Sequence, residues 1–124
     1  MTDISILFYL DKKFCEECKM DKEKAWMKYT ADRSLMATNG HNPYLEKTDD
    51  IRNTIQQVFN LENIDFTWIP IHGGMSDDST MGFTTGNYTR IYTSNGKEVK
   101  QIGKYVSIWK KIDGLWKIVF DMGN

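Results

Sequence analysis

Three side chains of this sequence could act as general bases in a proton transfer: His41, His72 and Asp121. Histidine has an intrinsic pKa close to neutrality, which suits it to accept and return a proton in neutral solution. His41 follows a turn at Thr38 to Gly40, and His72 precedes two glycines. A single histidine in such a place is more often solvated than functional, so each of them also has a purely structural interpretation.

Cys15 and Cys18 form a C-x-x-C motif, which in other proteins holds zinc or carries a redox disulfide. A zinc site needs two further ligands, but the sequence has no third cysteine and its two histidines lie far apart. Glu16 and Glu17 stand beside the thiols within a helical pattern, which disfavours the thiolate that redox chemistry requires. We therefore interpret both cysteines as small core residues.

The charge composition of the chain argues against nucleic acid and acidic membranes as binding partners. The 124 residues include 16 basic and 17 acidic side chains, so the net charge of -1 gives no attraction to nucleic acid or to an acidic membrane. No phosphate-binding loop, metal-ligand motif or nucleophile elbow occurs, and we expect no cofactor and no metal. The apolar run near the N-terminus is too short for a signal peptide or a membrane span, which predicts a cytoplasmic protein.

The first half of the chain predicts three helices. Apolar residues recur near the 3.6-residue period over residues 4–18 and again over residues 21–29. A third helix is predicted to begin at Thr48, whose hydroxyl can cap it. A short apolar run at residues 34–37 separates the second helix from a cluster of turn formers at residues 38–43.

The second half predicts long strands, at residues 64–75, 81–93 and 99–111, followed by a closing strand. Pro70 indicates that the first of these strands is interrupted or lies at a sheet edge. Asn95-Gly96 and Asp113-Gly114 each predict a two-residue type I′ hairpin turn, and these turns fix the register on either side.

Counting from Asn95-Gly96 places Tyr105 opposite Gly86 and Trp109 opposite Gly82. A glycine opposite a large ring lets the sheet bend toward the aromatic side. We therefore predict a single α+β domain over residues 1–124. Its three helices pack on a strongly curved antiparallel sheet, a cone-shaped half-barrel with a cavity between the layers.

The concave side of this sheet supplies aromatic walls and hydroxyl groups, which suit a mostly apolar ligand with a few polar atoms. The predicted ligand-binding residues are Trp26, Tyr29, Thr84, Tyr88, Tyr105, Ser107 and Trp109. Each of them could instead simply pack against the helices, because buried tyrosine and tryptophan usually find a local partner.

Counting from Asp113-Gly114 places Asp121 opposite Val106, on the outer side of the sheet with Lys104 and Asn87. In that register the three polar residues form a surface cluster. A single β-bulge would turn them toward the cavity instead, and bulges are common where sheets bend.

The order of elements and several segments resemble the nuclear transport factor two-like superfamily, in particular its small ketosteroid-isomerase-like and polyketide-cyclase-like members. The matching segments are residues 82–88, residues 103–110 and the stretch from Asp113 to Asp121, with looser matches at residues 29–32 and 68–70. The resemblance implies a curved sheet with a helix-lined pocket, and frequent homodimers formed through the outer sheet face. It does not imply a reaction, because this fold hosts many functions.

The sequence departs from the isomerases where their chemistry takes place. Steroid isomerisation needs a carboxylate base, together with an oxyanion hole made of a phenol and a protonated carboxylic acid. Ketosteroid isomerase has this arrangement. The resemblance puts Thr38 at the position of the base and offers Phe8 and Phe14 where the phenol is wanted. Threonine cannot serve as a base near neutral pH.

Three hypotheses follow. The first is a domain that binds an unidentified small molecule in an aromatic cavity. The second is a homodimeric assembly module that uses an outer apolar patch of Phe83, Val106, Ile108 and Val119, rimmed by Lys104, Lys110 and Lys117. The third is a cofactor-free isomerase, cyclase or dehydratase whose base is His41, His72 or Asp121.

Overall fold

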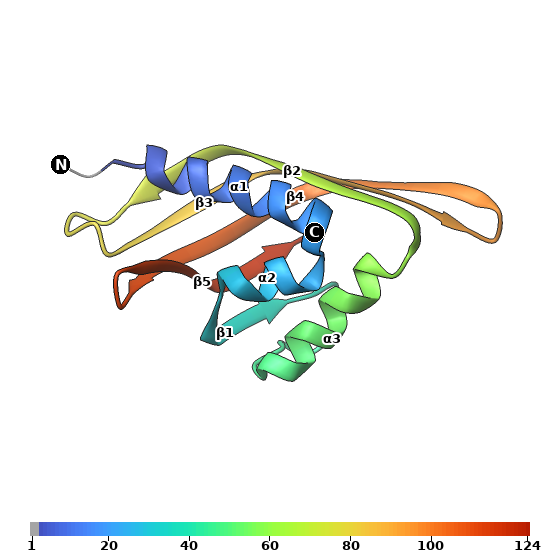
Figure 1. Ribbon diagram of the computed structural model, residues 1–124, viewed down its shortest axis with the longest axis horizontal. Helices are drawn as coiled ribbons and strands as arrows, with labels where there is room; N and C mark the ends of the chain where they lie inside the picture. The colour runs from blue at the N-terminus through green and yellow to red at the C-terminus, as the bar shows by residue number, and fades with distance from the viewer. Residues whose placement is uncertain (1–2) are drawn as a thin grey trace.

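In the computed structural model, which describes residues 3–124, three helices lie on one face of a five-stranded sheet (Figure 1). The elements are α1 (Ser5–Asp21), α2 (Glu23–Tyr29), β1 (Thr30–Ala37), α3 (Thr48–Phe59), β2 (Glu62–Met75), β3 (Met81–Ser94), β4 (Lys97–Ile112) and β5 (Leu115–Gly123). The strand order across the sheet is β1-β5-β4-β3-β2. The predicted α+β class, with helices on one side of an open sheet, is confirmed.

The helices begin and end near the predicted positions. α1 and α2 are separated by Lys22, whose positive φ of 55° breaks the helical path. α3 starts at Thr48 as predicted, but the Thr48 hydroxyl does not cap it; that hydroxyl donates to the backbone carbonyl oxygen of Asp32 at 3.3 Å. The bond ties the start of α3 to β1.

Both predicted hairpin turns are present. Asn95 and Gly96 have φ values of 52° and 75°, and Asp113 and Gly114 have values of 51° and 80°. Two successive residues with positive φ define the type I′ turn. The register that the first turn sets is confirmed, with Tyr105 opposite Gly86.

The register beyond the second turn differs from the prediction. Trp109 pairs with Ile118 as expected, but Ile108 pairs with Phe120, so that Val119 is an inserted residue. This β-bulge shifts the rest of β5 by one position and exchanges its two faces. Asp121 therefore lies opposite Ser107, on the concave side, and not opposite Val106.

Two further features concern the sheet edges. The sheet is mixed, because β1 pairs with β5 in parallel, whereas the prediction was wholly antiparallel. β2 forms the other edge and its register shifts between Pro70 and His72, as the proline indicated.

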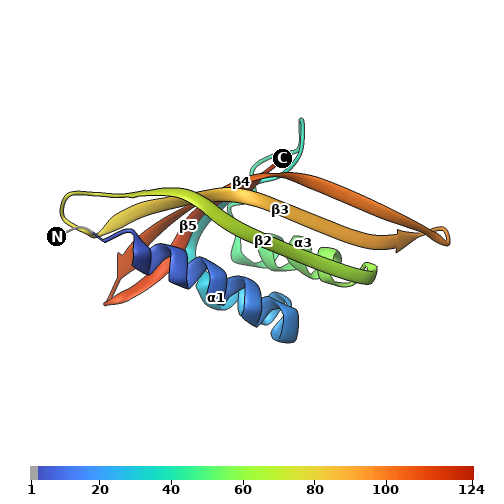
Figure 2. The same cartoon turned by 90° about the horizontal axis from the view of Figure 1, so that it is seen from above.

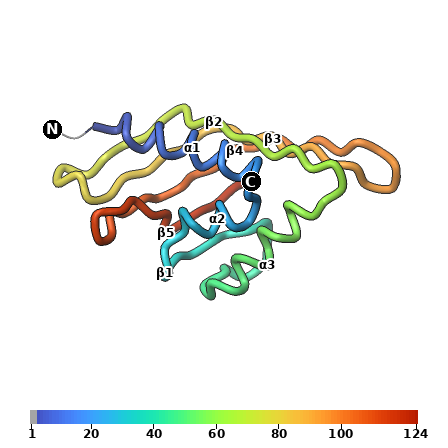
Figure 3. The backbone as a smooth tube through the Cα atoms, viewed as in Figure 1, coloured from blue at the N-terminus to red at the C-terminus, as the bar shows by residue number. Residues whose placement is uncertain are grey.

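The core lies between the helices and the concave face of the sheet (Figure 2). Aromatic rings dominate it: the Phe14 ring centre lies 4.9 Å from those of Trp26 and Trp68. The far ends of β3 and β4 reach past α3 as a long hairpin that no helix covers (Figure 3). No helix within residues 3–124 has the length and apolar character needed to cross a membrane.

Candidate functional site

A cavity of about 240 Å³ lies between α3, β1 and the concave face of β2 to β5. Its walls are mostly aromatic and aliphatic, with Trp26 and Phe66 stacked at 6.0 Å between ring centres. Two exposed residues of the turn after β1, Asn39 and Asn42, line one side. Because these two residues are exposed, the cavity opens to solvent on that side.

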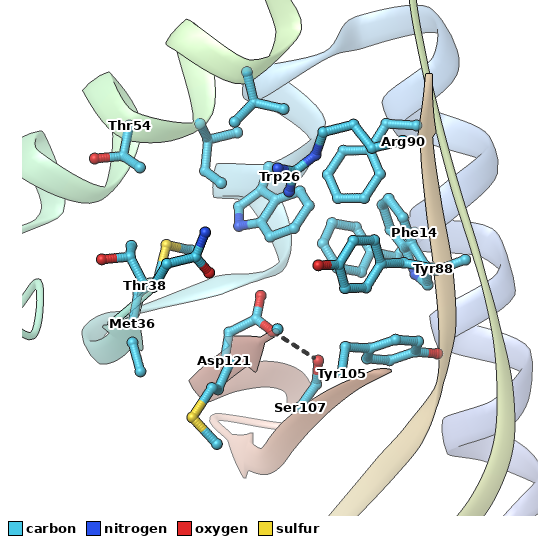
Figure 4. A pocket seen from close by; sticks show the side chains of 18 of the residues that line it. Phe14, Trp26, Met36, Thr38, Thr54, Tyr88, Arg90, Tyr105, Ser107 and Asp121 are labelled. Atoms are coloured by element: carbon cyan, nitrogen blue, oxygen red, sulfur yellow. Dashed lines mark hydrogen bonds between the residues drawn. The ribbon is translucent and has the colours of Figure 1, made fainter. Parts of the chain in front are cut away.

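Asp121 and Ser107 form one polar end of the cavity (Figure 4). The Ser107 hydroxyl donates a hydrogen bond of 3.2 Å to Asp121 Oδ1. The two residues are neighbours only because the bulge at Val119 turns Asp121 inward. Thus the alternative in which a bulge re-aims Asp121 is the arrangement found.

The surroundings of Asp121 favour its protonated form. Burial and the negative charge of Asp11 together raise the pKa of this carboxyl to about 7, against hydrogen bonds from Ser107 and the Met122 backbone that lower it. A carboxyl with this pKa is populated in both protonation states near neutrality. It can therefore donate a hydrogen bond or a proton, or accept either one.

Asp11 is a fully buried carboxyl on α1, between that helix and the sheet, and it is hydrogen-bonded to two strand residues that line the cavity. The Trp68 indole N–H donates to its Oδ1 at 2.8 Å, and the Tyr105 hydroxyl donates to its Oδ2 at 2.7 Å. Burial raises the pKa of Asp11, while these bonds lower it. The Tyr105 ring lines the cavity, but its hydroxyl is directed at Asp11 and away from the cavity (Figure 4).

The structure brings together four of the seven predicted ligand-binding residues. Trp26, Tyr88, Tyr105 and Ser107 line the cavity. The other three are not among its lining residues: Trp109 donates to the Thr84 hydroxyl at 3.0 Å in the core, and the Tyr29 hydroxyl donates to Glu17. Those three have the packing role that we considered as the alternative.

Of the three candidate bases, Asp121 lines the cavity and the two histidines do not. His41 is exposed in the turn after β1, and His72 is exposed on edge strand β2. Lys104 and Asn87 remain exposed, paired with each other across β3 and β4. The bulge therefore separates Asp121 from the two residues with which the sequence had grouped it.

Sequence reasoning missed Asp11 and Arg90. Asp11 stands four residues after Leu7 and three before Phe14, so helical spacing alone places it on the buried stripe. Arg90 lines the cavity two residues after Tyr88, on the same side of β3. Alternation along the strand could have found it.

The two cysteines are buried and free, as predicted. Burial raises the pKa of both thiols, which opposes thiolate chemistry. Within residues 3–124, no three histidine, cysteine or acidic side chains lie close enough together to hold a metal ion.

No protein-family model and no curated protein matches this chain. Solved structures do. A ketosteroid isomerase-like protein from Erwinia carotovora atroseptica superposes with a TM-score of 0.79 at 12% identity, covering 99% of this chain and 96% of that one. A nuclear transport factor two-like protein of unknown function from Shewanella oneidensis gives 0.65 at 16% identity, covering 93% of each chain.

The association domain of C. elegans CaMKII gives a TM-score of 0.73 at 8% identity, covering 97% of this chain and 93% of that domain. At such identities the similarity shows the fold alone. The fold is the nuclear transport factor two-like fold that the sequence resembles.

Proposed function

We propose that this chain, with its nuclear transport factor two-like fold, binds a small cyclic molecule in the aromatic cavity, with Asp121 as a polar contact. The observation that carries the proposal is the placement of Asp121 and Ser107 at one end of an open cavity whose walls are mostly apolar. Pockets for small molecules characteristically combine apolar walls with a few convergent polar groups.

The size of the cavity bounds the ligand. At about 240 Å³ it lies just below the roughly 300–1,000 Å³ typical of small-molecule pockets. The flat faces of Trp26 and Tyr88 favour a planar ring, which can stack on them. A rigid ring also loses less conformational entropy on binding than a flexible chain does. We therefore expect a ligand of one or two rings.

A fragment screen by NMR tests the proposal. Cyclic compounds that carry one hydrogen-bonding group are added to the isotope-labelled protein. We expect binders to shift the backbone amide signals of Ser107, Tyr88 and Asp121, while those of the distant Asn95-Gly96 turn stay unchanged.

Two variants of α3 make the screen specific. Val58 lines the cavity, and Val58→Trp should fill it and abolish binding. Gln57 is the exposed neighbour, so Gln57→Trp should bind as the wild type does. A library without binders, or binding that survives Val58→Trp in a folded protein, would contradict the proposal.

A second candidate function is proton transfer on the bound molecule. It is favoured by the pKa of Asp121, which burial and Asp11 raise to about 7, the range in which a general acid or base works best at neutral pH. Asp121 would then be the acid–base group of a cofactor-free isomerase, cyclase or dehydratase. Conversion of a binder from the screen, lost in Asp121→Asn, is the expected sign of turnover.

We also propose that two copies of this chain associate through the outer sheet face. Phe83, Ile108, Phe120 and Leu35 are paired in a row across β3, β4, β5 and β1. The bulge at Val119 places Phe120 on this face, opposite Ile108. Phe83 is 41% exposed and Met122, on the same face, is 42% exposed, and an apolar row of this kind is normally covered by a partner.

A further inference from the structure

Arg90 places a cation on the cavity wall without a carboxylate partner. It lies on the concave side of β3, opposite Phe66 of β2 and Gln101 of β4. Its guanidinium carbon is 4.7 Å from the Phe66 ring centre and 5.5 Å from the Tyr88 ring centre. None of the ion pairs found within residues 3–124 involves Arg90.

The hydrogen bonds of Arg90 are incomplete. Nη1 donates to Gln101 Oε1 at 3.3 Å, a long bond to a neutral acceptor. Nε is buried and has no hydrogen-bond partner among the described residues. A buried donor of a charged group that is left unpaired keeps its desolvation penalty, so an acceptor that reaches Nε would bind favourably.

The Arg90 side chain is directed so that its donors can meet a ligand in the cavity. Arg90 extends from β3 across the upper part of the cavity toward Trp26, whereas Asp121 lies at the opposite end (Figure 4). The cavity thus has a cation at one end, a carboxyl at the other and aromatic walls between them. A molecule that spans it meets both polar ends.

The chemistry of the lining residues selects the kind of anion. Arg90 is the only basic residue among the described residues that line the cavity. One guanidinium edge, Nε with a terminal nitrogen, matches the two oxygens of one carboxylate through parallel hydrogen bonds. A phosphate, with about two negative charges, would call for further cations, and the cavity wall offers none.

We infer that the cavity recognises a carboxylic acid of one or two rings, with its carboxylate on Arg90 and its ring between the aromatic walls. This inference rests on the proposed function and names its ligand class. Arg90 is the residue that determines specificity, and the end of the ring far from the carboxylate faces Asp121 and Ser107.

Isothermal titration calorimetry with matched pairs of probes tests the inference. The probes are trans-cinnamate, 4-hydroxybenzoate and indole-3-acetate, each measured beside its own neutral carboxamide. We expect at least one acid to bind the wild type about tenfold more tightly than its amide, because a charge-assisted pair replaces a neutral hydrogen bond. Equal affinity of acid and amide would overturn the inference and leave the proposed function intact. If neither member of any pair binds, both fail.

Variants of Arg90 test whether this residue causes the preference for the acid over its amide. Arg90→Gln should bind acid and amide equally, and Arg90→Lys, which keeps the charge but not the paired donors, should keep only part of the preference. Arg33→Gln, at an exposed position of β1, should behave as the wild type. A preference that persists in folded Arg90→Gln would overturn the inference. The comparison of acid with amide in the wild type needs no variant, so poor folding of a variant does not remove the test.

Discussion

The surroundings of Asp121 set the pKa of its carboxyl group. An ordinary aspartate titrates near pH 3.9, but in the cavity burial and Asp11 raise its pKa to about 7. A carboxyl that holds its proton near neutrality can donate a hydrogen bond to a carbonyl or accept one from a hydroxyl. The functional group of the ligand then determines whether Asp121 donates or accepts the hydrogen bond.

This pKa predicts a pH dependence of stability. Between roughly pH 4 and pH 7 the folded chain keeps a proton that the unfolded chain has released, so the free energy of unfolding falls as pH rises through that range. Asp121→Asn cannot ionise, and it should reduce the fall by on the order of 4 kcal/mol, the free energy that corresponds to about three pKa units. Urea denaturation at a series of pH values measures it, with the exposed carboxyl variant Asp65→Asn as the control. An unchanged slope in Asp121→Asn would refute the assignment.

Asp11 should influence the titration of Asp121 through its negative charge. Asp11→Asn removes a negative charge and keeps one acceptor for Trp68 or Tyr105. Because the charge of Asp11 raises the pKa of Asp121, the variant should titrate Asp121 at a lower pH than the wild type. NMR detection of the Asp121 side-chain carboxyl carbon measures this directly, and a pKa that rises or stays the same would show that the two carboxyls are not coupled.

For single residues, the sequence predicted which side chains face the cavity better than it predicted their hydrogen-bond partners. Tyr88 and Ser107 were placed on the cavity wall from turn-derived register alone. Asp11 was not, because a carboxylate on an apolar stripe has meaning only when its donors are known. Those donors, Trp68 and Tyr105, come from strands 57 and 94 residues away in sequence.

Among the elements, β5 decides which groups face the cavity. Its segment Ile118-Val119-Phe120 is apolar at every position, so alternation gives no sign of where one residue is inserted. The turn at Asp113-Gly114 fixes the register only as far as the bulge. This is why the β3–β4 pairing could be predicted completely, whereas the face of Asp121 could not.

At Gly86 in β3 the close approach of β2 leaves no room for a side chain. A Cβ built there would lie 1.9 Å from the backbone carbonyl oxygen of Ile69. Because a backbone atom cannot rotate away, Gly86→Ala should force β2 and β3 apart and destabilise the protein by about 1–3 kcal/mol or more. Chemical denaturation measures the loss, with Asn87→Ala, at an exposed neighbour, as the control. Equal stability of the two variants would show that the strands are not so closely fixed.

For the whole molecule, the α+β class, the layer of helices on the concave face of the sheet and the cavity between the layers follow from the sequence pattern. The parallel pairing of β1 with β5 did not, since the short run at residues 34–37 carries no turn that fixes its neighbour. Long-range pairing of this kind is set by packing of the finished layers. The same layering leaves one apolar row uncovered on the outer face of the sheet.

That row predicts the state of association. The wild type should sediment as a dimer at micromolar concentration, and Phe120→Glu should sediment as a monomer, because the substitution would bury charges at a two-fold contact. Lys12→Glu, on the exposed surface of α1, should remain a dimer. A monomeric wild type in analytical ultracentrifugation would rule out self-association through this face.

The most direct test of ligand binding in the cavity is a crystal structure of the protein with the tightest binder found in the screen. We predict a ring in the cavity between Trp26 and Tyr88, with a polar atom within hydrogen-bond distance of Asp121 or Ser107. A cavity filled by the protein's own side chains, or a ligand bound only elsewhere on the surface, would contradict the account.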